Sequence, residues 1–224
     1  MSAPLRLIDV LTERFSAARM EPYRTAAQGD PGLTVKLYDW NIRIGAAFFE
    51  DICIIEILLR NTLDSALRDR YQTEMDMTPW YDHDHALLTS SYKAVDVAKQ
   101  EVRDYLGLND DKEPDQDDVI ARLGFGFWLM LLNRQHESKL GTIIKPCFTY
   151  ASGKAVYLDV VSTKVGDLYE MRNAIAHHHP IFHWDFDDSA TNVLYLAEWM
   201  SQPLRAWLFQ RSRVVDVLKE NPLR

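Results

Sequence analysis

The chain has 224 residues, of which 47% are hydrophobic and 26% charged, and its formal net charge is −8 at pH 7. This composition is typical of a packed globular protein, and no Gly/Ser-rich or Pro-rich linker divides the chain, so the sequence predicts a single domain. No apolar run is long enough to span a bilayer, and the net charge argues against a nucleic-acid partner held by the overall field of the protein.

Helical periodicity dominates the chain, and no pair of alternating strands is present. The predicted helices cover residues 5–18, 34–71, 86–106, 117–140, 155–178 and 189–218. A loop is expected from Pro22 to residue 32, while Pro180 should end the fifth helix and Pro203 should kink the last one. The predicted fold class is therefore an all-α helical bundle.

Much of the negative charge lies in residues 109–118 (NDDKEPDQDD), which hold six acidic residues and one lysine. This segment contributes −5 of the net −8 and leaves −3 for the rest of the chain. We interpret it as a solvated loop between two helices. Any binding to a nucleic acid must then depend on a local patch of the surface.

Two features indicate a cytoplasmic location. The first twenty residues lack the layout of a signal peptide, because charges interrupt their apolar positions. Cys53 and Cys147 form neither a CxxC pair nor a disulfide framework. Both are expected to be buried thiols in a reducing compartment.

The fifth predicted helix carries an arginine in its apolar stripe. A buried guanidinium without a counter-charge is costly, so Arg172 needs a carboxylate, a partner chain or a phosphate ligand. His177 follows at the helix end, and five residues rotate by about 140° on an ideal helix, so the two side chains diverge. They can meet at one ligand only if the helix end unwinds or a second copy supplies one of them. This geometry predicts a symmetric homodimer. The stripe consists of Leu158, Val161, Val165, Leu168 and Ile175, with Met171 at its edge.

Residues 172–177 have the form RNxxxH, which resembles the Arg-x4–6-His motif of HEPN ribonucleases. The surrounding residues 168–182 (LYEMRNAIAHHHPIF) look like the version found in the Abi-like (abortive infection) HEPN family. Three more elements resemble that family in the same order: LYDWN at 37–41, EILLRN at 56–61 and GFW at 126–128. RNxxxH alone is a weak signal, but four elements in order are a strong one.

The resemblance implies an HEPN-like helical bundle with additional helices. Residues 1–33 would form an N-terminal helix and loop, 34–182 the family-like core, and 183–224 a C-terminal helix. It also implies a metal-independent endoribonuclease without a cofactor, acting as the effector or toxin of an abortive-infection or toxin–antitoxin antiviral defence system. The expected partners are an RNA substrate, a second copy of the chain, and an antitoxin that is a structured RNA or a protein, with no membrane.

The residue types suit this chemistry. RNA cleavage without metal requires deprotonation of the 2′-hydroxyl and protonation of the leaving 5′-oxygen, giving a 2′,3′-cyclic phosphate and a 5′-hydroxyl. These are general acid–base tasks for imidazoles, assigned here to His177 with assistance from His178. Arg172 would clamp the phosphate as its negative charge develops, and Asn173 would orient one of these groups or bind a phosphate oxygen. The structural alternative is that Arg172 ion-pairs within the core and His177 caps the helix.

Glu56, Arg60 and Asn61 are the candidate supporting residues. Glu56 interrupts an apolar run at 52–59, so it is expected to be buried and paired. Its partner is either Arg60, four residues further on, or Arg172. The pair is then either purely structural or serves to position Arg172.

Two other functions remain open on the sequence alone. The first is a non-catalytic HEPN protein that binds or regulates RNA, and the second is a structural helical dimer. A metal site is not expected at His177–His179 and His183, because adjacent histidines on a helix point in different directions and no HExxH spacing is present.

Overall fold

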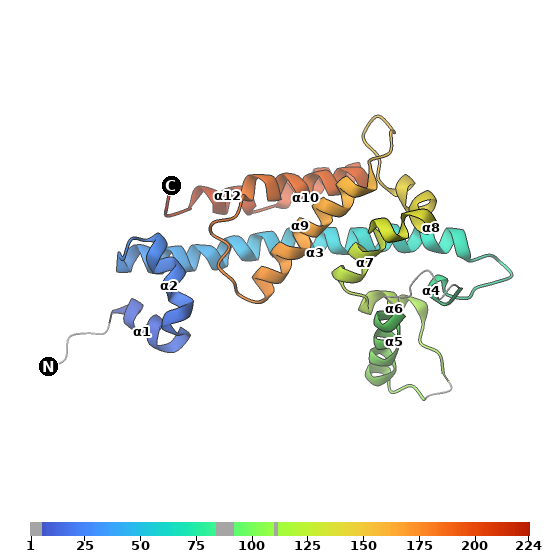
Figure 1. The fold of residues 1–224 in the computed structure, drawn as a ribbon, viewed down its shortest axis with the longest axis horizontal. Helices are drawn as coiled ribbons and strands as arrows, with labels where there is room; N and C mark the ends of the chain where they lie inside the picture. Colours follow the sequence, from blue (N-terminus) through green and yellow to red (C-terminus); the bar gives the residue numbers. More distant parts are fainter. Residues whose placement is uncertain (1–5, 84–91, 110–111) are drawn as a thin grey trace.

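Figure 1 shows the computed structural model of the chain, which describes residues 6–83, 92–109 and 112–224. The described helices are α1 (Leu7–Phe15), α2 (Ala17–Ala26), α3 (Pro31–Tyr71), α4 (Trp80–His83), α5 (Tyr92–Leu106), α6 (Gln116–Arg122), α7 (Phe125–Leu131), α8 (Arg134–Ile144), the 3-10 helix η1 (Lys145–Cys147), α9 (Leu158–Ala176), α10 (Phe186–Met200), α11 (Gln202–Arg211) and α12 (Val214–Lys219). Within the described ranges there is no strand, and the two β-bridges, Thr73–Asp76 and Thr149–Ala155, are isolated. The predicted all-α class is confirmed.

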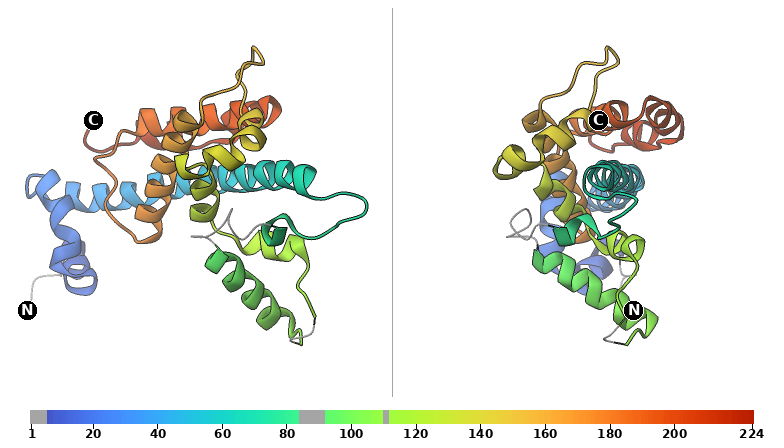
Figure 2. Two further views of the ribbon diagram at one scale, coloured as in Figure 1. Left: turned by 45° about the vertical axis from the view of Figure 1, so that its right-hand side comes forward. Right: turned by 90° about the vertical axis from the view of Figure 1, so that its right-hand side faces the viewer.

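Helix α3 is the scaffold of the fold. Its 41 residues extend for about 60 Å at 1.5 Å per residue, and Asp30 caps its start by accepting a hydrogen bond of 2.7 Å from Leu33 N. Helices α1 and α2 pack at one end of α3 and α4 at the other, while α9 crosses it and α10 and α12 lie alongside (Figures 1 and 2). Because so many elements share α3, the chain is organised around one long core. Its fully buried face includes Leu37, Ile44, Phe48, Ile52, Ile55, Leu59 and Leu63.

The N-terminal segment differs from its prediction. The loop expected from Pro22 does not begin there, because Pro22 lies inside α2. Proline inside a helix costs about 3 kcal/mol, but α2 buries the ring of Tyr23 against Tyr38 and Phe182, at centroid distances of 5.0 and 5.3 Å. Tertiary packing therefore outweighs the local preference. The break comes earlier, at Ser16, whose φ is 82°.

The predicted helix at 117–140 is wrong as one continuous element. It is divided into α6, α7 and α8, with Gly124 and Asn133 at the N-caps of the second and third. Residues 125–132 are apolar on all sides and none of them is exposed, and the breaks on either side let α7 turn Phe125 and Trp128 into the core. Trp128 Nε1 donates to the carbonyl of Leu123 over 3.0 Å, which satisfies a carbonyl exposed by the break.

The C-terminal helix predicted at 189–218 is likewise three helices, α10 to α12. Pro203 does not kink a helix but lies in the first turn of α11, where its missing N–H costs nothing. Trp207 of α11 is 49% exposed, with the Arg211 guanidinium over its ring at 5.3 Å. Asp51 of α3 accepts hydrogen bonds from Arg211 and Ser212, which fixes these helices to the scaffold. Burial raises the pKa of the Asp51 carboxyl.

Three further expectations can be compared with the described residues. Cys53 and Cys147 are free thiols, half-buried rather than fully buried. The acidic segment is not only a loop, because α6 begins within it and Asp117 forms an ion pair of 2.6 Å with Arg68. In the part of the chain described, no helix is both long enough and apolar enough to cross a membrane.

Candidate functional site

The candidate site lies on α9, which crosses α3 near the middle of the molecule (Figure 1). Met171, at 0% exposure, lies within the buried stripe of α9 and not at its edge as predicted. Arg172 is half-buried and flanks the stripe. Arg172 is therefore at the boundary between core and solvent. The buried side chains of α9 are Leu158, Val161, Val165, Leu168, Met171 and Ala174.

The Arg172 guanidinium has few partners within the chain. Its Nη1 donates to Oδ1 of the neighbouring Asn173 over 3.4 Å, which is long for a hydrogen bond. Its Nε is buried and has no hydrogen-bond partner, and no described carboxylate forms an ion pair with it. The predicted alternative of an ion pair within the core is thus absent from the described chain. A buried donor without an acceptor costs about 1–3 kcal/mol, so the Arg172 Nε is left unsatisfied by the described residues.

Cys53 marks the part of α3 that Arg172 faces. Burial raises the pKa of the Cys53 thiol, the Glu56 carboxylate raises it further, and the Arg172 guanidinium acts in the opposite direction. Both charged groups thus act on the Cys53 thiol, and α9 packs directly on α3. The α3 and α9 parts of the predicted site therefore meet.

Glu56 departs from its prediction in two respects. It is half-buried instead of buried, and among the described residues it forms an ion pair with neither Arg60 nor Arg172. Arg60 instead donates through Nε to Oδ1 of Asn61 over 3.2 Å. The physical reason is that Glu56 lies at the edge of the core-facing side of α3, where water still solvates its carboxylate. Glu56 and Arg172 both act on the Cys53 thiol, but no described ion pair joins them.

The end of α9 is a tight reversal that displays three histidines. His177 is the C-cap, and its N–H donates to the carbonyl of Asn173 over 2.9 Å. His178 has a φ of 57°, and the N–H groups of His178 and His179 donate to Ile175 and Ala174 over 2.9 and 2.8 Å. This is the pairing of a Schellman motif with histidine at the left-handed position that glycine usually takes. The imidazole of His177 is exposed, with the ring of His179 at 6.0 Å.

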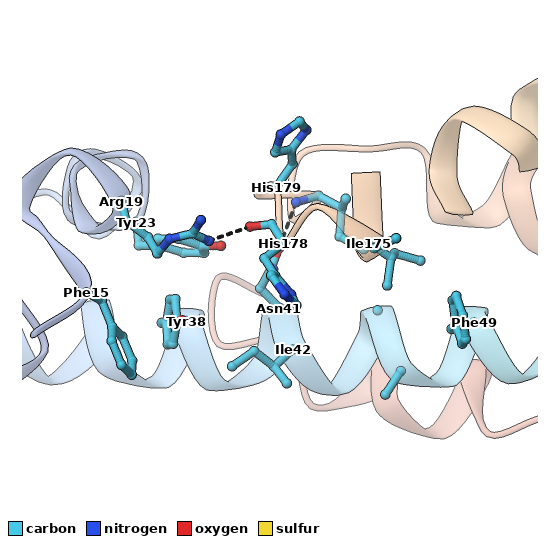
Figure 3. A pocket seen from close by; sticks show the side chains of 14 residues that line it. Phe15, Arg19, Tyr23, Tyr38, Asn41, Ile42, Phe49, Ile175, His178 and His179 are labelled. Atoms are coloured by element: carbon cyan, nitrogen blue, oxygen red, sulfur yellow. Dashed lines mark hydrogen bonds between the residues drawn. The ribbon is translucent and has the colours of Figure 1, made fainter. Parts of the chain in front are cut away.

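Two side chains hold this reversal against the scaffold (Figure 3). Asn41 Oδ1 accepts hydrogen bonds from the N–H groups of Ile181 and Phe182 at 2.8 and 3.1 Å. Arg19 donates through Nη1 to the carbonyl of His178 over 2.8 Å. Asn41 is itself buried, so removing its oxygen would leave a buried N–H unpaired. The last residue of the LYDWN element thus positions the segment that follows the RNxxxH motif.

The GFW element packs α7 against α9. A Cβ added at Gly126 would lie 3.1 Å from the Tyr169 hydroxyl and 3.3 Å from its ring, closer than most real contacts. Glycine at this position therefore lets the two helices approach each other. Phe125 contacts the same tyrosine edge-on, with ring centroids 6.0 Å apart.

A cavity of about 740 Å³ lies between α2, α3 and the end of α9 (Figure 3). Its lining is mostly apolar, and the residues that bring polar groups to it are Arg19, Tyr23, Tyr38, Asn41, His178 and His179. Burial raises the pKa of Tyr23, on its wall, to about 12, so this hydroxyl keeps its proton. Of the predicted site residues only His178 borders the cavity, and neither Arg172 nor His177 does.

The structure thus brings together some of the predicted residues and separates others. Arg172, Asn173 and Glu56 form one neighbourhood, and His177 and His178 form another at the helix end. No described hydrogen bond or ion pair joins Arg172 to His177. Arg19 was missed because its role depends on a contact with a segment 159 residues away, which no sequence pattern indicates.

No protein-family model matches the chain, and neither a curated protein nor a solved structure matches it. In the described ranges no group of three or more His, Cys, Asp and Glu side chains is arranged to hold a metal ion. The functional argument therefore depends on α9 and its neighbours.

Proposed function

We propose that the chain is a metal-independent endoribonuclease with an HEPN-like bundle, and that it acts as the effector of an abortive-infection or toxin–antitoxin defence system. The observation that supports this most is Arg172, a half-buried guanidinium whose Nε lacks an acceptor and whose charge no described carboxylate neutralises. A phosphate diester supplies oxygens that would complete this group. The exposed imidazole of His177 lies at the end of the same helix.

The proposed reaction is an internal transesterification. A basic imidazole takes the proton of the RNA 2′-hydroxyl, and the 2′-oxygen forms a bond to phosphorus. The bond from phosphorus to the 5′-oxygen breaks, and an acidic imidazole gives that oxygen its proton. The products are a 2′,3′-cyclic phosphate and a 5′-hydroxyl. Arg172 stabilises the extra negative charge on the phosphoryl oxygens during the step.

Within one chain, no described hydrogen bond or ion pair joins Arg172 to His177, and five residues along a helix turn the two side chains apart by about 140°. The two proton transfers are assigned to His177 and the neighbouring His178 of the same chain. A homodimer resolves the divergence, because the second copy can place its His177 and His178 beside the Arg172 of the first. We therefore propose a site that is shared between two copies.

The three other family-like elements support this proposal through their contacts. Asn41 fixes the segment after α9, Glu56 acts on the same Cys53 thiol as Arg172, and Gly126 lets α7 pack against α9. Elements far apart in the sequence thus converge on the one helix that carries RNxxxH. Convergence on a single helix is expected if that helix carries the activity.

The experiment is an RNA-cleavage assay with the purified chain in excess EDTA, followed by analysis of the product ends. We expect cleavage to continue, leaving 2′,3′-cyclic phosphate and 5′-hydroxyl ends. Complete loss of cleavage on chelation, with recovery on addition of a divalent metal, would contradict the proposal. RNA binding without cleavage under all conditions would favour a non-catalytic RNA-binding protein.

A further inference from the structure

One face of α3 is apolar and largely exposed, and Ile42, Ala46 and Phe49 on this face also line the cavity between α2, α3 and the end of α9. Ile42, Phe49 and Ile57 are 53%, 37% and 49% exposed, and they lie on the side of α3 opposite its core face. Ala46 and Cys53 fill the positions between them at helical spacing. Residues 42–57 therefore form a stripe about 22 Å long on one side of the helix. We call these five residues the α3 stripe.

Charged residues lie just beyond both ends of the α3 stripe. Asp39 precedes it, is exposed and has no ion pair among the described residues. Arg60 follows it and donates only to Asn61 within those residues. A single chain thus leaves an acid at one end of the stripe and a base at the other, both available to a partner.

The α3 stripe is self-complementary: it matches the same stripe of a second copy that runs in the opposite direction. In an antiparallel pair of copies centred between Phe49 and Glu50, Ile42 faces the partner's Ile57 and Ala46 faces the partner's Cys53. Asp39 then faces the partner's Arg60, and the same contacts occur twice. Large apolar groups thus meet large ones, small ones meet small ones, and opposite charges meet. A parallel pair would instead set Asp39 against Asp39 and Arg60 against Arg60.

We propose that the α3 stripe is the interface with a second copy of this chain, paired antiparallel in this register. The surface is inferred from α3 alone and does not depend on RNA cleavage. It also deepens the proposed function. Cys53 and Glu56, which neighbour Arg172, come opposite the partner's residues 43–46, and Gly45 is where the end of α9 packs on α3. The pairing therefore brings the partner's His177 to His179 towards Arg172.

The register is tested by disulfide cross-linking. In a Cys147→Ser background that retains Cys53, Ala46→Cys places two thiols opposite each other across the interface. We expect most of the chain to migrate as a covalent dimer after mild oxidation. Val97→Cys in the same background is the matched control, because Val97 is similarly exposed on α5 and should give no such dimer.

Charge exchange provides a second measurement that does not depend on thiols. Arg60→Asp should raise the dimer dissociation constant about tenfold or more, because it sets two acids against each other twice. Asp39→Arg should do the same, and the double variant Asp39→Arg with Arg60→Asp should restore dimerisation. Circular dichroism verifies that each variant is folded.

Each outcome separates this interface from the proposed activity. Cross-linking at position 46 but not 97, with rescue in the double variant, supports the register. A dimer in light scattering that fails to cross-link at position 46 overturns the register but leaves a shared ribonuclease site on another surface. A chain that remains monomeric at micromolar concentration overturns the interface and the shared site together.

Discussion

His177→Ala is expected to abolish RNA cleavage while leaving the fold and RNA binding nearly unchanged. The imidazole is exposed and its described ring contact is with another histidine, so its removal leaves no cavity and no unpaired buried group. The structural role of His177 as C-cap belongs to its backbone N–H, which alanine keeps. General acid–base catalysis contributes about 10²–10⁴-fold, so cleavage should fall at least by that factor.

The matched control is His183→Ala, which removes another exposed imidazole a few residues away from the reversal. We expect this variant to cleave RNA at the wild-type rate. Cleavage and melting temperature are measured for both variants and the wild type. Wild-type cleavage by His177→Ala would remove this residue from the mechanism, and equal losses in both variants would show an effect of histidine content or charge.

Arg172→Met is expected to lose cleavage without losing stability. Methionine keeps the stem of the side chain but removes a buried Nε that has no acceptor, which costs about 1–3 kcal/mol when left unpaired. The free energy of unfolding should therefore stay constant or rise. Cleavage should fall about 10²–10³-fold or more, as for the loss of a group that stabilises transition-state charge. RNA binding should weaken as well, because a phosphate contact is lost.

Arg172→Lys separates the charge from the geometry of the guanidinium. Lysine retains the charge but not the bidentate fork, so we expect partial recovery of binding and little recovery of cleavage. Chemical denaturation provides the stability of each variant. A loss of about 3–5 kcal/mol in Arg172→Met would instead show that Arg172 is one partner of a buried ion pair, and full cleavage by either variant would contradict its proposed role.

The parts of the fold governed by helical periodicity were predictable from the sequence. The span of α3 was predicted from the recurrence of residues such as Leu37, Ile44 and Ile52, with its start three residues too late. The end of α9 was predicted from Pro180, within two residues. In both helices one face is buried continuously, so the burial pattern is visible in the chain itself.

The predictions failed where tertiary contacts override local preference. Pro22 lies inside α2 because Tyr23 packs against Phe182, which is distant in sequence. The segment at 117–140 is divided because α7 is buried on all sides, whereas α6 and α8 each keep one side exposed, so the three helices need different orientations. Periodicity carries no information about either effect.

The candidate site, like the fold, could be predicted from the sequence only in part. The terminal position of His177 could be predicted from spacing along one helix, but Arg172 was predicted inside the apolar stripe and instead lies at the edge of the core. The burial and pairing of Glu56 could not, because they depend on how α9 crosses α3, which decides whether a carboxylate and a guanidinium meet. The same is true of the contact between Arg19 and His178.

The central claim is that Arg172 of one copy and His177 of another complete one RNA-cleaving site. It is tested most directly by mixing two inactive variants, Arg172→Met and His177→Ala, that are co-expressed with different tags and purified together. A mixed dimer holds one site with both residues intact and one with neither, so a random assortment should recover roughly a quarter of the wild-type Arg–His pairs. We predict that the mixture cleaves RNA well above either variant alone. A mixture that forms mixed dimers and stays as inactive as its components would contradict the shared site.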